Sequence, residues 1–227
     1  MQTVSSPFRC LPLLLMTLGL AGLTVCGSRV AQSPEAAAAC SAQPAPNPAL
    51  ARQIEPEGLD QWLFDEAVRH AVNAERCRRG LVPLAQDPAL ARAASIHSGD
   101  MLVHEFFDHN SPVDGRTTLG DRYAQTGAQY SRAAENIATI SLYDFDGRHF
   151  NRRNPAACDF TFTQGGPSIA RLSYSGAARS LVDGWMDSPG HRRNLLHPGM
   201  TRHGAGVAFR PDLDICGKLV VVQDFAG

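Results

Sequence analysis

The spacing of apolar residues changes once along this chain, and that change constrains the fold more than any other feature. Apolar residues recur every three or four positions over 59–79. Further along, Asp87 is a typical helix-capping residue, and Pro88 after it suits the first turn of a helix. Both patterns predict helices in the first half of the chain. The remaining patterns predict helices at 117–125 and 177–186, and strands at 136–140, 204–210 and 218–225. Helices that come first and antiparallel strands that come late predict an α+β fold.

The first 27 residues predict a signal peptide. An apolar run over 11–25 follows a single positive charge, Arg9, and is too short for a membrane span but suits the apolar core of an export signal. Two cleavage sites fit: a lipoprotein-type site before Cys26, which would then carry lipid, and an ordinary site after Gly27. Both predict an exported protein that is secreted, periplasmic or lipid-anchored at the cell envelope.

Residues 28–58 differ from the rest in composition. Alanine and proline dominate, and no apolar period is present, so this segment predicts a flexible tether. The folded domain is then expected over 59–227, interrupted by an insertion at about 142–175. That insertion combines aromatic and basic residues, and two interpretations stay open: a lid or recognition loop beside a groove, and a surface elaboration held by Cys158.

Four cysteines remain after signal-peptide removal, an even number that suits an oxidising compartment. They allow three pairings, and none lies in a C-x-x-C pair, which argues against a zinc finger or a thioredoxin-like site. We favour Cys158 with Cys216, because this bridge joins the insertion to the loop between the last two strands and stabilises by roughly 2–5 kcal/mol. Cys40 with Cys77 follows by elimination.

Charge and motif spacing exclude several function classes. The chain has 21 basic and 22 acidic residues, a formal charge of −1, which argues against nucleic-acid binding or charge-driven membrane binding. Membrane contact is expected only through a lipid anchor. His104 and His109 lie five residues apart, whereas the zinc-protease motif needs four. The sequence contains neither a serine-hydrolase elbow nor a phosphate-binding loop, and 204–209 lacks the third glycine of a dinucleotide site.

The segment from Leu59 to Phe225 carries short blocks in a fixed order. They are Asn73–Arg76, Leu90–Met101, Phe106–Pro112, Ala134–Ala138, Trp185–Leu196, Gly204–Phe209 and Val222–Phe225. In these blocks the sequence resembles the CAP superfamily, or SCP domain, which contains cysteine-rich secretory proteins, antigen 5 and pathogenesis-related proteins. It is most similar to the bacterial, exported branch.

The resemblance implies a three-layer α-β-α sandwich with a small antiparallel sheet and a groove that holds two histidines and two glutamates. It assigns His109, Glu135 and His191 to three of these places. Many relatives carry a groove glutamine at the position of Asn194. The second glutamate is missing: its place is Ser188, and Asp187 lies one residue earlier.

The three matching groups support more than one chemistry. Two neutral imidazoles and a carboxylate can bind Zn²⁺ or another divalent ion and leave a position open to water. The same His–Glu contact can act as a general base, or it can join two loops without an ion or a reaction. We therefore expect His109, Glu135 and His191 to converge, Asn136 and Ser188 to be turn and cap residues, and Met101 and Trp185 to belong to the core.

Three functions follow from these alternatives. The favoured one is an exported, monomeric binding module whose groove holds a lipid, a peptide or another envelope component, with or without a divalent ion. The second is a metal-dependent or His/Glu-dependent hydrolase. The third is a structural or interaction protein with a vestigial groove.

Overall fold

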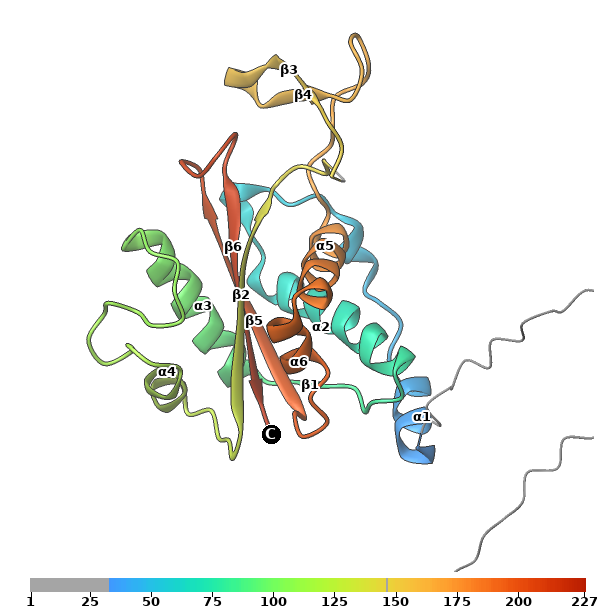
Figure 1. The fold of residues 1–227 in the computed structure, drawn as a ribbon, viewed down its shortest axis with the longest axis vertical. Coiled ribbons are helices and arrows are strands. Elements are labelled where there is room, and N and C mark those ends of the chain that lie inside the picture. Colours follow the sequence, from blue (N-terminus) through green and yellow to red (C-terminus); the bar gives the residue numbers. More distant parts are fainter. Residues whose placement is uncertain (1–32, 146) are drawn as a thin grey trace, which may run out of the picture.

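Helices cover both faces of a central sheet in the computed structural model, which describes residues 33–145 and 147–227. Figure 1 shows the sheet edge-on, with helices on each side of it. One side carries α2 (Gln61–Arg78), α5 (Tyr174–Asp187) and α6 (Pro189–Leu195), and the other carries α3 (Pro88–Val103) and α4 (Leu119–Thr126). The chain is therefore an α+β protein with the expected three layers.

The central sheet has the strand order β1-β5-β6-β2. Its strands are β1 (Ala85–Gln86), β2 (Ala133–Ser141), β5 (Arg202–Arg210) and β6 (Lys218–Ala226). β5 and β6 form an antiparallel hairpin across the expected loop, and β2 pairs antiparallel with the other edge of β6. β1, which the sequence did not predict, pairs parallel with β5.

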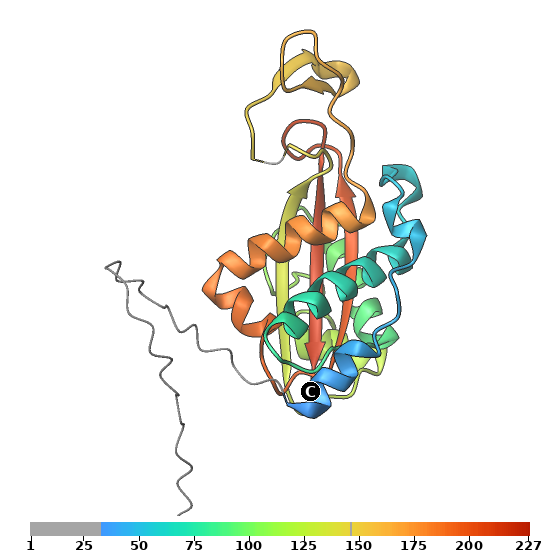
Figure 2. The same ribbon diagram turned by 90° about the vertical axis from the view of Figure 1, so that its right-hand side faces the viewer.

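Strand β6 explains the continuous apolar run near the C-terminus. Leu219, Val221 and Phe225 belong to the core under α2 and α5, whereas Val220 and Val222 pack with residues of α3 on the opposite face. A strand buried on both faces is expected to be apolar on both, and β6 is so over Leu219–Val222. Figure 2 shows α2 and α5 crossing the near face of the sheet side by side. Met101 and Trp185 are buried, as expected.

Two glycines bring α3 unusually close to β5. A Cβ atom at Gly204 would overlap the backbone of Ala91 on α3, and one at Gly206 would overlap the backbone of Ser95. The helix therefore lies on bare strand backbone at these two positions. This close approach fixes the position of α3, and with it the loop that follows α3.

Beyond the short β1, side chains of α2 make hydrogen bonds to the backbone groups on the outer edge of β5. The Gln61 side-chain amide donates to the carbonyl of Val207 and accepts from its N–H, and Asp65 accepts from the N–H of Ala205. Burial raises the pKa of the Asp65 carboxyl to about 6. These contacts supply the hydrogen bonds that another strand would make.

The expected flexible tether is wrong for residues 33–58. Helix α1 (Pro34–Ser41) begins at the capping residue Ser33, and two 3₁₀ turns follow, η1 (Pro48–Ala51) and η2 (Pro56–Gly58). Leu50 and Ile54 are buried in the core beside α2. Burial of these apolar side chains overrides the alanine- and proline-rich composition.

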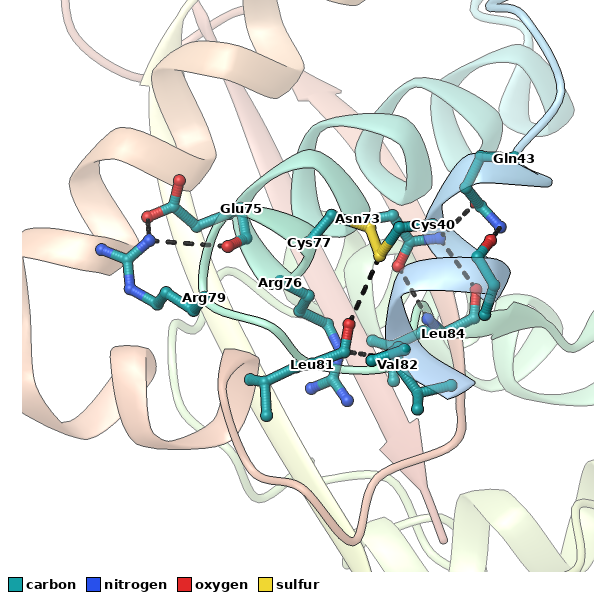
Figure 3. The surroundings of a disulfide bond; sticks show 12 residues. Cys40, Gln43, Asn73, Glu75, Arg76, Cys77, Arg79, Leu81, Val82 and Leu84 are labelled. Carbon is teal, nitrogen blue, oxygen red and sulfur yellow. Dashed lines mark hydrogen bonds and ion pairs between the residues drawn. A yellow bond between two sulfur atoms is a disulfide. The ribbon is translucent and has the colours of Figure 1, made fainter. Parts of the chain in front are cut away.

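A disulfide also holds this segment. Cys40 of α1 is bonded to Cys77 of α2, as predicted, and Figure 3 shows the surrounding contacts. Asn73 donates to the side-chain oxygen of Gln43 and to the carbonyl of Leu84, and so links α2 to the chain on both sides of it. The folded unit therefore extends toward the N-terminus beyond residue 59.

Two local expectations near α5 and β2 are also wrong. The helix expected at 177–186 ends at Asp187, but a second helix, α6, follows at once and was not expected; Pro189 opens it, because a proline is tolerated in the first helical turn. Ser188 occupies the cap position of α6, as expected, but its side chain makes no capping hydrogen bond. Asn136 is not a turn residue; it is fully buried within β2.

The insertion forms a separate projection beyond the end of the sheet (Figures 1 and 2). It contains the two-stranded ribbon β3 (Asn151–Asn154) and β4 (Asp159–Thr161), with the short 3₁₀ turn η3 (Pro155–Ala157) between the strands. The predicted disulfide Cys158–Cys216 fastens it to the β5–β6 loop. Its interior is a group of contacting rings: Tyr143, Phe145, Phe150 and Phe160.

The predicted signal peptide, the lipidation candidate Cys26 and residues 28–32 of the expected tether lie outside the described residues. Within residues 33–145 and 147–227, no helix has the length and apolar character needed to cross a membrane.

Candidate functional site

Glu135 is the centre of the candidate site. Its carboxylate is buried near the start of β2 and accepts hydrogen bonds at both oxygens. The Nδ1–H of His109 donates to Oε1 at 2.7 Å, and Nη2 of Arg122 donates to Oε2 at 2.6 Å. Nε2 of the buried His97 lies 3.9 Å from Oε1. The predicted contact between His109 and Glu135 is therefore present, and two further basic side chains flank it.

The start of α4 places Arg122, one of the two groups that bind the carboxylate of Glu135. Thr118 and Asp121 form a capping box that starts α4, and the next residue, Arg122, is fully buried. Arg122 also donates to the carbonyl of His109. One guanidinium thus holds both the carboxylate and the loop that carries the imidazole.

His109 combines a fixed ring with solvent exposure. Its side chain is 54% exposed, although Nδ1 is bonded to a buried carboxylate. The hydrogen bond from His109 to Glu135 raises the pKa of the imidazole, and burial opposes this effect. Nε2 has no hydrogen-bond partner among the described residues. The arrangement therefore presents one polar nitrogen in a set direction.

His191 reaches the same region from α6. The amide of Asn136 donates to its backbone carbonyl, and Asn194 donates to Asn136 and to the carbonyl of Glu135. These contacts fasten α6 to β2. Burial lowers the pKa of His191, and the nearby charge of His109 contributes to that shift. His109 and Glu135 therefore meet as expected, whereas His191 lies outside the set of residues that line the cleft around His109.

A second buried carboxyl lies beside Glu135 and was not predicted as a site residue. Asp224 of β6 is directly opposite Glu135 in the strand register, is fully buried, and accepts no hydrogen bond from a described donor. Burial and the charge of Glu135 raise the pKa of Asp224 well above its usual value. The neutral acid is therefore favoured next to the charged Glu135.

The alternatives for the missing fourth acid do not join the site. Asp187 is exposed at the end of α5, and Ser188 links α5 to α6; neither lines the cleft around His109. Arg122 and Asp224 take part instead. In the sequence, Asp224 stands out only as a member of the block Val222–Phe225, and Arg122 only as a charged residue of the helix expected at 117–125. Their approach depends on strand register and helix packing, which local patterns do not contain.

The cleft at this site is open and has a volume of about 370 Å³. The polar part of its wall consists of His109, Asn110, Glu135 and Asn194. Leu119 and Ala134 supply the apolar part. Asn194 therefore lies in the groove, as the resemblance implied.

Two features of the described residues weigh against the three-ligand zinc site expected from the sequence. Both oxygens of Glu135 are engaged, and the guanidinium of Arg122 would repel a cation at this carboxylate. Within residues 33–145 and 147–227, no three His, Cys, Asp or Glu side chains are grouped as metal ligands. Glu135 instead orients His109, and zinc binding stays a prediction.

Two curated proteins of Bacillus subtilis (strain 168) are similar in sequence to this chain. It is 30% identical over 143 residues to the uncharacterized protein YkwD, and 30% identical over 148 residues to the uncharacterized membrane protein YlbC. These matches cover 63% and 65% of this chain but only 42% and 32% of the relatives. The chain thus spans less than half the length of each.

Solved structures give similar matches. An extracellular protein containing a SCP domain from Bacillus anthracis str. Ames is 28% identical, with a TM-score of 0.47 over 72% of this chain and 40% of that one. An outer surface protein from Borrelia burgdorferi is 14% identical, with a TM-score of 0.49 over 74% of this chain and 96% of that one. The model of the cysteine-rich secretory protein family matches residues 69–225, which is more than half of the chain. The chain therefore belongs to the cysteine-rich secretory protein (CAP) family.

Proposed function

We propose that the protein is an exported binding module whose cleft at His109 and Glu135 holds an acidic group of a lipid, a peptide or another envelope component. The carrying observation is the row Arg122–Glu135–His109, in which a buried ion pair orients an exposed imidazole. A protonated imidazole donates to carboxylate or phosphate oxygens. The apolar wall residues Leu119 and Ala134 offer contact to the carbon part of such a ligand.

The same contact also supports the hydrolase alternative. A general base draws strength from a carboxylate that stabilises the imidazolium it becomes. The hydrogen bond to Glu135 raises the pKa of His109 in this way, and the charge of Arg122 opposes the shift without reversing it. Retention or cleavage of the ligand distinguishes the two functions.

Two features support export. The first 27 residues carry the pattern of a signal peptide, and four cysteines form two disulfides, which persist in oxidising compartments. An exported module would meet its ligand at the cell envelope or outside the cell, which is why envelope components are the first ligands to test.

Native mass spectrometry tests the proposed function. Purified protein is incubated with the lipid fraction and with the peptide fraction of bacterial cell envelopes, and the retained masses are identified. We expect a retained acidic compound that His109→Ala loses and His149→Ala, which changes an exposed histidine of the insertion, keeps. Equal retention by His109→Ala would contradict the proposal, and a cleaved product in place of a retained mass would favour the hydrolase.

A further inference from the structure

A second and larger cleft lies at the far end of β2 from Glu135. Ser141 ends β2 six residues after Glu135, which corresponds to about 20 Å along a strand. The cleft has a volume of about 580 Å³ and is bounded by the end of β2, by α5 and by the start of the insertion. We call it the α5 cleft. The volume is in the range of sites that hold small molecules.

The charged groups of the α5 cleft have no partners among the described residues. Arg179 and Asp183 of α5 and Asp144 of the insertion line it, are exposed, and make no side-chain hydrogen bond or ion pair within residues 33–145 and 147–227. Arg179 and Asp183 are four residues apart on the helix, a spacing at which opposite charges commonly pair. They stay apart, so a donor group and two acceptor groups face the cleft unpaired.

The apolar part of the wall is aromatic. Tyr143 and Phe145 line the cleft and are half-buried, because they belong to the ring cluster that also contains Phe160. Their packing holds the rings in place before any ligand arrives. Fixed aromatic surface beside unpaired charged and hydroxyl groups, including Ser180, suits a ligand with an apolar face and many hydroxyl groups.

These observations point to a sugar. We propose that the α5 cleft is a second binding site, distinct from the cleft at His109, and that it takes a short oligosaccharide. Sugar hydroxyls both donate and accept, so one ring can pair with Arg179 and with Asp183. Two aspartates against one arginine disfavour a nucleic acid, and three unpaired charges disfavour a lipid tail.

A neighbouring cavity argues for a chain of sugars over a single ring. It has a volume of about 420 Å³, lies between η1, α2 and α5, and shares Arg179 with the α5 cleft. Pro48, Leu50 and Ala71 give it a more apolar wall. A ligand that passes Arg179 can therefore occupy both cavities.

Isothermal calorimetry with chitotriose, cellotriose and maltotriose tests this proposal on the purified protein, with trialanine as the peptide comparison. We expect at least one trisaccharide to bind, and Arg179→Gln and Asp183→Asn each to weaken binding at least tenfold. Asp187→Asn is the matched control, since Asp187 is exposed on the same helix one turn further and lies outside the cleft. All three side chains are exposed, so the variants are expected to fold.

Three results would overturn the proposal. The first is that none of the trisaccharides binds. The second is that a trisaccharide binds with the same affinity to wild type, Arg179→Gln and Asp183→Asn. The third is that trialanine binds and the sugars do not, which would assign the cleft to a peptide.

Discussion

Arg122 and Glu135 form a buried ion pair that joins α4 to β2. Both side chains are almost fully buried, with 0% and 3% of their surface exposed. Removing the guanidinium would leave a buried carboxylate without its charged partner, which costs about 3–5 kcal/mol. We therefore expect Arg122→Met to lower the free energy of unfolding by that amount, as measured by urea denaturation.

A surface pair gives the control for that measurement. Arg52 and Asp60 lie 3.4 Å apart with 60% and 43% of their side chains exposed. Such pairs contribute about 0–1 kcal/mol, so Arg52→Met should change stability little. If both variants lose the same free energy of unfolding, Arg122 does not stabilise the buried charge of Glu135.

The pKa of His109 should be raised above its ordinary value because Glu135 accepts its hydrogen bond. Its pKa is raised in the folded state, so this contact stabilises fully below the unfolded value of about 6.5 and is lost as pH rises through the folded pKa. NMR titration of the imidazole measures this directly. Glu135→Gln should lower the pKa of His109; an unchanged pKa would mean that the contact is absent in solution.

Sequence patterns found His109, Glu135 and Asn194 but missed Arg122 and Asp224. The first three stand in motif blocks that can be recognised along the chain. Asp224 meets Glu135 only because β2 and β6 pair in one particular register, and Arg122 meets it only because α4 packs beside α3. Contacts between residues far apart in sequence are not visible in local patterns.

Helix α3 depends on the two glycines of β5 beneath it. Gly206→Ala would push a Cβ into the backbone of α3, and overpacking against backbone should cost about 3 kcal/mol, the upper end of the usual range. Gly184→Ala is the control, because Gly184 lies in α5 with open space around its Cα and should gain about 0.5–1 kcal/mol. Thermal unfolding measures both. A harmless Gly206→Ala would contradict the close approach of α3.

The two disulfides fasten different elements, and limited proteolysis should separate them. Without Cys158–Cys216 the insertion loses its covalent link to the β5–β6 loop but keeps its ring cluster and the Arg171–Glu55 ion pair, so we expect cleavage within residues 147–168 while the sandwich stays intact. Without Cys40–Cys77 the insertion should stay resistant, and stability should fall by about 2–5 kcal/mol. Cleavage throughout the sandwich in the Cys158→Ala/Cys216→Ala variant would contradict this division.

Elements with a strong period were predicted well, and elements set by context were not. The helices α2 and α3 and the strands β5 and β6 lie within a few residues of their expected positions. Helix α1 was missed because alanine and proline also suit a linker, and only Cys40 pointed to a fixed position. Helix α6 was missed because a proline both ends one helix and begins the next.

At the scale of the whole molecule, two clefts lie toward opposite ends of β2. The cleft at His109 lies near the start of β2, and the α5 cleft lies near its end. The insertion was expected as a lid or recognition loop beside the groove, or as a surface elaboration held by Cys158. It leaves the end of β2 far from Glu135, so it is not a lid over His109. The family resemblance predicted the layers, but it could not place an insertion of this length.

The central claim is that Glu135 holds His109 in a ligand-binding cleft, and an NMR titration of histidine-labelled protein tests it most directly. The probes are dihexanoyl phosphatidylglycerol and a short peptide with a free terminal carboxylate. For at least one probe, we predict saturable shifts of the His109 imidazole signals in wild type and at least tenfold weaker binding in Glu135→Gln, about 1.4 kcal/mol. Unmoved His109 signals with both probes, or equal affinity in Glu135→Gln, would contradict the account.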